Sequence, residues 1–346
     1  FGHSRGLVQI LSKAGYTGYL FCRPNQNDCP LPNDDFTWVG YDGSTVAAHR
    51  VFGHYNAPLG KADEKIKCWL EQHAKRTEGL VLWGVGNHGG GPSRIDLERI
   101  QALSAEEKNF KLIHSTAEAY FAELAANNAP LPSHAGDLNP WAVGCYTSQV
   151  KIKQKHRQLE NELYLVEKMA SATALCGQKE YPVAEINEAL YDLLLSEFHD
   201  ILPGSSIQPV EEASIRCVDH GLEILSRLKT RAFFALASGQ PKAKPGEIPI
   251  LIYNPHPFPV QGTFACEFML ADQNRKEEFT LPLVYQGDQQ LASQPEKEDS
   301  NVPMDWRKRV VFSATLAPSQ MNRFDCKLKT VPQKPKPELK AENGKL

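Results

Sequence analysis

The sequence predicts a multidomain protein in which an α/β region, a three-helix bundle and a β-sandwich region follow one another along the chain. Three changes of hydrophobic pattern support this order. Short apolar runs alternate with amphipathic stretches over residues 1–126. Within 127–238, a polar connection rich in proline and glycine leads to apolar residues that recur every three or four positions from Ser148 onward. Over 247–330, apolar and polar residues alternate. A length of 346 residues fits two or three domains. We expect residues 331–346 to be a linker or the start of a further β domain.

In the α/β region, short apolar runs predict buried strands at 19–22, 80–83 and 110–113. The turn Tyr41-Asp42-Gly43 joins two further runs, 36–39 and 45–48, into a hairpin. Helices are expected at 7–11, 62–76, 94–103 and 116–126. Strand, loop and helix in this repeated order indicate a parallel sheet, whose ligands bind at the carboxyl ends of the strands. The loops after Cys22 and Trp83 are therefore the expected places for chemistry.

The bundle is predicted from three long amphipathic stretches, which begin near Ser148, Val183 and Ser206. The second stretch runs from three leucines into His199 and Asp200 before Pro203-Gly204 ends it. We therefore expect His199 and Asp200 in the last turn of a mostly apolar helix, partly desolvated. On this pattern alone, His199 is either a core histidine with satisfied ring nitrogens or a metal ligand backed by the neighbouring carboxylate.

The β-sandwich region follows a linker rich in proline and lysine after Ser238. Five stretches alternate as half-buried strands do, at 248–253, 262–269, 277–285, 309–316 and 323–328. Residues 286–306 are polar, and we expect them to form a mobile loop. Residues 342–346 are expected to begin another strand.

Composition excludes several classes of function. A net charge of −3 leaves no electrostatic footprint for nucleic acid or an anionic membrane. No apolar run approaches the ~18 residues of a membrane span. The eight cysteines include no Cys-x-x-Cys pair, so a thiolate zinc site is not expected, and reduced thiols indicate a cytoplasmic protein. Because the chain begins at Phe1 in mid-motif, we expect it to be an internal piece of a longer protein.

Five stretches carry recognisable motifs: Phe1-Gly2-His3-Ser4, Arg23-Pro24-Asn25, the loop 84–92, Gly136-Asp137-Leu138 with the nearby 144–149, and 198–206. Together they resemble glycoside hydrolase family 38, the zinc-dependent α-mannosidases. The likeness covers nearly the whole chain in the right order, and the last stretch is the strongest match. The resemblance implies a partial, barrel-like α/β catalytic domain over 1–126, a helical middle domain, and retaining hydrolysis of terminal α-mannosides.

The resemblance also implies a metal site. The family holds one zinc ion with two histidines and two aspartates, and His199 matches one of the histidines. The other three ligands would precede Phe1, and one of them, an aspartate two positions upstream, would also be the nucleophile. We therefore expect the 346-residue chain alone to be inactive and to bind zinc weakly or not at all.

A retaining glycosidase needs a second carboxyl group as its acid/base, and the resemblance points to Asp137. The alternative interpretation of Asp137 is a turn or N-cap aspartate. An acid needs a raised pKa, which burial beside Trp141 would supply.

Substrate contacts are implied for five residues. Phe1 would be an aromatic platform for the sugar, and Arg23 would lie beside the nucleophile carboxylate. Asn87 and His88 would touch the substrate from the glycine-rich loop, although the family usually has Asp where Asn87 stands. Asp200 would bind a substrate hydroxyl or orient the metal shell.

Two other functions stay open from the sequence. Hydrolysis of a small mannosyl conjugate such as mannosylglycerate would require basic residues on the aglycone side. A non-catalytic carbohydrate-binding module would fit the Asn87 substitution and the absent barrel strands. The expected partner is an α-mannoside or oligosaccharide, with no nucleic acid and no membrane, and homo-oligomer formation is left open.

Overall fold

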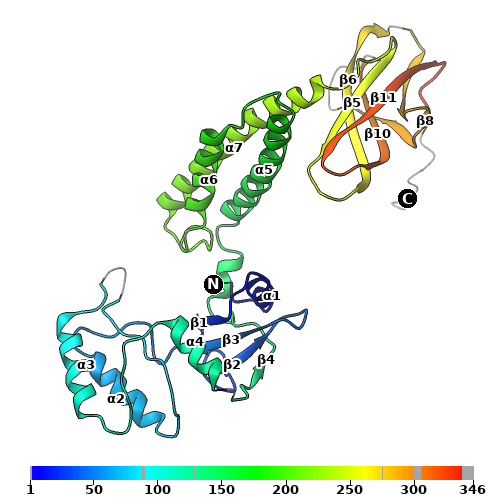
Figure 1. Ribbon diagram of the computed structural model, residues 1–346. Helices are drawn as coiled ribbons and strands as arrows, with labels where there is room; N and C mark the ends of the chain where they lie inside the picture. Colours follow the sequence, from blue (N-terminus) through cyan, green and yellow to red (C-terminus); the bar gives the residue numbers. More distant parts are fainter. Residues whose placement is uncertain (1, 87–89, 128, 275, 299–304, 337–346) are drawn as a thin grey trace, which may run out of the picture. The chain divides into compact units, whose positions relative to one another are not determined.

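The computed structural model describes residues 2–86, 90–127, 129–274, 276–298 and 305–336. The chain divides into two compact units, Phe1–Ser148 and Gln149–Leu346. The first unit contains the predicted α/β region, and the second contains the three long helices and the C-terminal strands (Figure 1). Each unit has its own hydrophobic cores.

A mixed sheet forms the centre of the first unit. Its strands are β1 (Gly18–Phe21), β2 (Asp35–Val39), β3 (Thr45–Arg50) and β4 (Ser133–His134), in the spatial order β1-β3-β2-β4. β1 runs parallel to β3, β2 and β3 form an antiparallel hairpin, and β4 runs parallel to β2. The predicted hairpin is confirmed. The expectation of a parallel sheet is wrong, because the hairpin places an antiparallel pair in the middle of the sheet.

The helices of the first unit are α1 (Gly6–Lys13), α2 (Ala62–Gln72), α3 (Arg94–Glu106) and α4 (Ala117–Ala126), with a 3₁₀ turn η1 (Val143–Tyr146) at its end. The hydroxyl groups of Ser93 and Thr116 begin α3 and α4 by accepting backbone N–H groups of the first turn. Val8 of α1 is fully buried in the same core as Phe36 and Trp38 of β2. The hydrophobic cluster under this sheet therefore fixes α1 on it.

Two predicted strands are absent from the described structure. Segments 80–83 and 110–113 have no strand geometry, and they are only partly buried or exposed. Val81, Trp83 and Leu112 instead pack against the cluster formed by α2 and α3 around Ile66. Their apolar character reflects this packing, because an extended apolar segment becomes a strand only where a partner strand lies beside it.

A buried polar network connects the sheet to the surrounding helices. The Asp35 carboxylate pairs with His49 Nδ1 at 2.6 Å, accepts a hydrogen bond from the Tyr120 hydroxyl at 2.8 Å, and pairs with Arg76 at 2.5 Å. Asp35, His49 and Tyr120 are all buried. Although burial opposes ionisation, these partners hold the pKa of Asp35 below its usual value. The network therefore joins β2, β3 and α4 around one buried carboxylate.

The second unit begins with three long helices, α5 (Val150–Leu175), α6 (Val183–Ser196) and α7 (Gln208–Ser238), which lie side by side (Figure 1). They share a core that includes Leu159, Leu193 and Leu225. Helix α6 ends at Ser196, so His199 and Asp200 lie in the turns that follow it and not in its last turn as predicted. The last amides of the segment bond three residues back, from Glu197 to Leu194 and from Phe198 to Leu195, which closes the helix before the proline is reached.

The remaining strands form two sheets. One has the order β6 (Val260–Asn274), β10 (Asp305–Leu316), β9 (Ser293–Glu296), and the other has the order β5 (Glu247–Asn254), β11 (Gln320–Val331), β7 (Phe279–Gln286), β8 (Gln289–Gln290). Phe312 of the first sheet and Phe324 of the second belong to one hydrophobic cluster. Strands β8 and β9 lie within 286–306, where a loop was expected. Residues 342–346 and their predicted strand lie outside the described residues.

Candidate functional site

The carboxyl ends of β1 and β3 lie at the same edge of the sheet, because these strands are parallel. The Val51 amide donates to the Phe21 carbonyl at 2.8 Å where the two strands end. Arg23 follows β1 and His54 follows β3, and Arg23 Nη2 lies 3.2 Å from His54 Nε2. Chemistry was predicted from the sequence after β1 but not after β3, because residues 45–48 were expected only as half of a hairpin.

Two further residues extend this contact into a chain of polar groups. His54 Nδ1 lies 2.8 Å from Asn56 Oδ1, so the imidazole joins Arg23 to Asn56. The Lys65 ammonium donates to the backbone carbonyl oxygens of His54 and Asn56, the latter at 3.1 Å, and to that of Leu82 at 2.7 Å. Burial lowers the pKa of Lys65 from its usual value. One cation therefore ties the segment after β3 to the segment that precedes the glycine-rich loop.

The glycine-rich loop starts and ends beside this chain of polar groups. The Ala57 amide donates to the Gly84 carbonyl at 2.8 Å, and Val85 and Gly91 form a short bridge between the two sides of the loop. A Cβ at position 86 would lie 2.5 Å from the Asn56 side chain, so only glycine fits there. Asn87 and His88, the predicted substrate contacts of this loop, lie outside the described residues.

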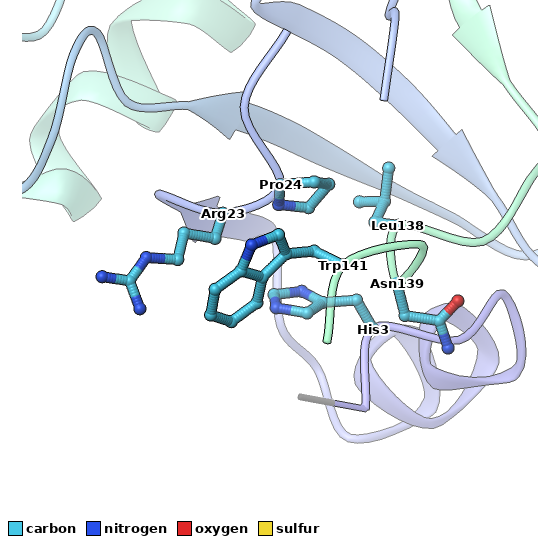
Figure 2. A pocket seen from close by; sticks show the side chains of 6 residues that line it. All are labelled: His3, Arg23, Pro24, Leu138, Asn139 and Trp141. Carbon is cyan, nitrogen blue, oxygen red and sulfur yellow. The ribbon is translucent and has the colours of Figure 1, made fainter. Parts of the chain in front are cut away.

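A small cavity of about 90 Å³ lies next to Arg23 (Figure 2). Its lining residues are His3, Arg23, Pro24, Leu138, Asn139 and Trp141. The Arg23 guanidinium carbon lies 5.1 Å from the centre of the Trp141 ring. An aromatic ring beside a cation and an amide offers an apolar face and hydrogen-bond donors together, which suits a polyhydroxylated ligand. Phe1, the predicted platform, lies outside the described residues.

His3 forms part of the wall of this cavity and is held by contacts with β1. Its Nδ1 lies 2.7 Å from the Tyr19 hydroxyl, and its ring makes edge contacts with Tyr19 and Phe21. Burial lowers the pKa of His3 to about 4. The imidazole is therefore neutral near pH 7 and forms part of the wall of the cavity.

Asp137 lies at the start of α1. Its Oδ1 accepts a hydrogen bond from the Arg5 amide at 2.7 Å, immediately before α1 begins at Gly6. The neighbouring Leu138 amide donates to the His3 carbonyl at 2.8 Å, which fixes this segment on the first unit. The side chain of Asp137 is exposed, so the expected burial beside Trp141 is not present. Its contact with Arg5 is of the helix-capping type that was the alternative interpretation.

His199 and Asp200 belong to the second unit, in the segment between α6 and α7. The His199 side chain is 67% exposed, and its Nε2 lies 3.6 Å from Asp200 Oδ2. Its ring is 4.2 Å from the ring of Phe198, which is itself half-exposed. The expectation of a desolvated histidine among core residues is therefore wrong. Leu194 and Leu195, which were expected to surround it, are about half-exposed because they face away from the bundle core.

Some features of the whole chain bear on its chemistry. Among the described residues, no three side chains of His, Cys, Asp or Glu gather into a set that could hold a metal ion. All eight cysteines lie in the described ranges, and all are free thiols. No helix in those ranges combines the length and the apolar character needed to cross a membrane.

Comparison with known proteins places both units in one family. The family model for the glycosyl hydrolases family 38 N-terminal domain matches residues 1–143, and the model for the alpha mannosidase middle domain matches residues 141–236. The two matches adjoin each other and together cover the cavity, Asp137 and the His199 segment.

Individual relatives agree with these matches. Human Alpha-mannosidase 2C1 is 32% identical over 267 residues, which are 75% of this chain and 25% of the human protein. The alpha-mannosidase of Saccharomyces cerevisiae is 29% identical over 225 residues, 61% of this chain and 21% of that protein. The chain therefore spans about a quarter of the length of the curated relatives it matches.

A solved structure shows the same fold. A Glycosyl Hydrolase Family 38 protein from Enterococcus faecalis aligns with 97% of this chain and 41% of its own, with a TM-score of 0.66 and 15% identity. The two family-model matches show that the chain belongs to glycoside hydrolase family 38, and the fold agrees with that of the solved structure.

Proposed function

We propose that the full-length protein is an α-mannosidase that hydrolyses terminal α-mannosides with retention at the anomeric carbon. The observation that carries this proposal is the match of the N-terminal and middle domains of one glycosidase family, one after the other, over residues 1–236. The arrangement of Arg23, His54 and Trp141 at the carboxyl edge of the sheet supports it, because this edge is where α/β enzymes bind their ligands.

In this proposal the residues of the chain divide the work of a double displacement. Asp137 protonates the departing oxygen and then takes a proton from the attacking water. Because its Oδ1 accepts the Arg5 amide, the proton transfer would use Oδ2. The Arg23 guanidinium, held between Trp141 and His54, keeps the nucleophile carboxylate ionised. That carboxylate is proposed to come from upstream of Phe1.

The remaining residues are proposed to bind the sugar. Phe1 would cover the apolar face of the ring, and Asn87 and His88 would reach its hydroxyl groups. Asp200 would accept a hydrogen bond from a hydroxyl, and the Ser205 hydroxyl, which donates to its Oδ1 at 3.1 Å, already holds the carboxylate in place. A neutral amide at position 87 would bind a hydroxyl without contributing charge.

A catalytic zinc ion is also proposed, with His199 as one ligand. When bound, zinc would supply Lewis-acid polarisation of sugar oxygens. The exposed imidazole of His199 is accessible to a metal, but the described residues provide no set of three ligands. The residues present do not by themselves fit a complete zinc site, and no step of the proposed mechanism uses the metal. We infer that the 346-residue chain alone is inactive and binds zinc weakly or not at all.

The acid/base role is tested with two aryl α-mannosides that differ in the leaving group. Asp137→Asn keeps an oxygen that can accept the Arg5 amide, so the start of α1 is preserved. In the full-length protein, this variant should lose about 10²-fold or more in kcat/KM on a phenyl mannoside and far less on a dinitrophenyl mannoside, which needs no acid. Asp42→Asn is the matched control, because Asp42 is an exposed turn aspartate that accepts the Ser44 amide. Equal losses on both substrates would remove Asp137 from the mechanism.

The activity itself is tested on the same substrates before and after exhaustive chelation. Turnover that survives complete metal removal would contradict the zinc part of the proposal. Glycan binding without any turnover by the full-length protein would favour a carbohydrate-binding module instead.

The proposal also covers the architecture and the location of the protein. We infer that α5, α6 and α7 form a three-helix bundle domain over 127–238 and that the two C-terminal sheets form a β-sandwich over 247–330, which their shared cluster around Phe312 and Phe324 supports. We infer a cytoplasmic location, which the eight free thiols support.

A further inference from the structure

Helix α5 and the residue immediately before it contact the segment between α6 and α7 at three places. The side chains that make these contacts are Gln149, Lys153 and His156. Lys153 and His156 lie three residues apart on one face of α5, and Gln149 directly precedes the helix. Their partners are Glu197, Leu202 and Ser206, which lie before and after His199 and Asp200.

The first contact fixes the end of α6. His156 is only 8% exposed, and its Nε2 lies 3.2 Å from Glu197 Oε1. Glu197 directly follows the last residue of α6 and lies two positions before His199. This contact therefore sets where the chain leaves the helix.

The second and third contacts fix the far side of the segment. The Lys153 ammonium donates to the Leu202 carbonyl at 2.9 Å. Gln149 and Ser206 bond reciprocally: the amide of Gln149 donates to the Ser206 carbonyl at 2.8 Å, and the Ser206 hydroxyl lies 3.2 Å from Gln149 Oε1. The backbone is thus held on both sides of His199.

Within the segment, the backbone forms its own turns. The Phe198 carbonyl accepts the amides of Ile201 and Leu202 at 2.8 and 3.2 Å, and the Ile201 carbonyl accepts the Gly204 amide at 2.9 Å. Ile201 is buried in the core of the helices. The backbone of this segment is therefore fixed by hydrogen bonds, while the imidazole of His199 is mostly exposed. A solvent-exposed connection of this length is ordinarily mobile.

We propose that Gln149, Lys153 and His156 are positioning residues that hold His199 and Asp200 in the orientation used for catalysis. The inference rests on the proposed function only for the role of His199 and Asp200. We call the three contacts of Gln149, Lys153 and His156 with the 197–206 segment the brace, and their existence does not depend on the proposed function. Pre-organised side chains avoid the entropic cost of ordering a loop when substrate binds, so loss of the brace should lower the rate without unfolding the domain.

The experiment compares Lys153→Met with Lys155→Met. Lys155 is the matched control, because it is a lysine of the same helix whose ammonium pairs with Asp219 of α7. In hydrogen exchange of the 346-residue chain, Lys153→Met should speed the amides of 198–204 by about tenfold and leave those of α5 and α7 unchanged. Lys155→Met should leave the 198–204 amides unchanged.

Kinetics of the full-length protein give the second measurement. Lys153→Met should lower kcat/KM on an aryl α-mannoside by about fivefold to tenfold more than Lys155→Met, at matched Tm losses. Lys153→Arg, which can still donate to the Leu202 carbonyl, should restore most of it, and Gln149→Ala repeats the test at another contact. A wild-type protein without mannosidase activity would refute the proposed function. The brace would then be judged from hydrogen exchange alone, and equal exchange of the 198–204 amides in both lysine variants would refute it. Active wild-type protein with equal exchange and equal kinetics in both lysine variants would overturn the brace.

Discussion

Replacing Lys65 by Met tests whether one cation holds the two loops of the candidate site together. The Lys65 ammonium donates to the carbonyl oxygens of His54, Asn56 and Leu82. Methionine has a similar length and no donor, so all three acceptors lose their partner. The segment after β3 would then be free to move away from the segment that leads into the glycine-rich loop.

The expected cost follows from the contacts. A partly buried carbonyl that loses its donor costs about 1–3 kcal/mol, and water at this edge of the sheet would recover part of that. Methionine also removes the cost of burying an ammonium group, which lowers the pKa of Lys65 in the native protein. The free energy of unfolding of the first unit should therefore fall by about 2–4 kcal/mol.

Urea unfolding followed by tryptophan fluorescence measures this loss. Four of the five tryptophans lie in the first unit, at positions 38, 69, 83 and 141, so the signal reports mainly on it. Lys67→Met is the control, because Lys67 lies on the same helix and its half-exposed ammonium pairs with Asp63 one helical turn away. It should cost less than about 0.5 kcal/mol. A Lys65→Met loss no larger than that of Lys67→Met would refute the reasoning.

Three further predictions follow from buried polar groups. Asp35→Ala should destabilise the first unit by about 3–5 kcal/mol in urea unfolding, because it leaves the buried His49 and Tyr120 unpaired, whereas Tyr120→Phe should cost only about 1 kcal/mol. Burial lowers the pKa of His3 from 6.5 to about 4, so the unfolded chain takes up the proton first. The unfolding free energy of the first unit should therefore fall as the pH drops from 6.5 to 4, and His3→Gln should flatten this slope. Burial also lowers the pKa of Lys308 from 10.5 to about 8, so unfolding free energy should rise between those pH values in wild type relative to Lys308→Met, and an equal slope in both would contradict it.

The sequence predicted best what depends on local periodicity. The three-and-four spacing of Leu159, Leu163 and Val166 is enough to predict α5, because each of these residues is buried in the helical core. The hairpin of β2 and β3 was also predicted, since its turn residues and alternating strands lie close together in the chain. Segments 80–83 and 110–113 could not be predicted in the same way. Val81, Trp83 and Leu112 are partly buried against the cluster formed by α2 and α3, and nothing in four residues distinguishes that environment from a sheet.

The candidate site shows the same division. Arg23 could be found from the sequence because it directly follows a strand. His54 and Asn56 reach it only because β1 and β3 are parallel neighbours, a pairing between residues about thirty positions apart. Lys65 carried no signal at all, since a lysine on an amphipathic helix ordinarily points to solvent. Its role depends on three backbone carbonyls that meet only in the folded chain.

The proposed role of His199 as a metal ligand does not depend on burial of its ring. The apolar residues before it predicted a buried ring, yet α6 ends at Ser196 and the ring lies mostly in solvent. A ligand that is to join donors from elsewhere in a protein has to present its nitrogen outside its own core. What such a ligand needs from its domain is a fixed backbone. Glu197 and Leu202 are held by side chains of α5, and Ser206 is held by Gln149, which directly precedes that helix. The exposed ring and the braced backbone are therefore consistent with one function, in which the helical domain contributes orientation and other residues complete the site.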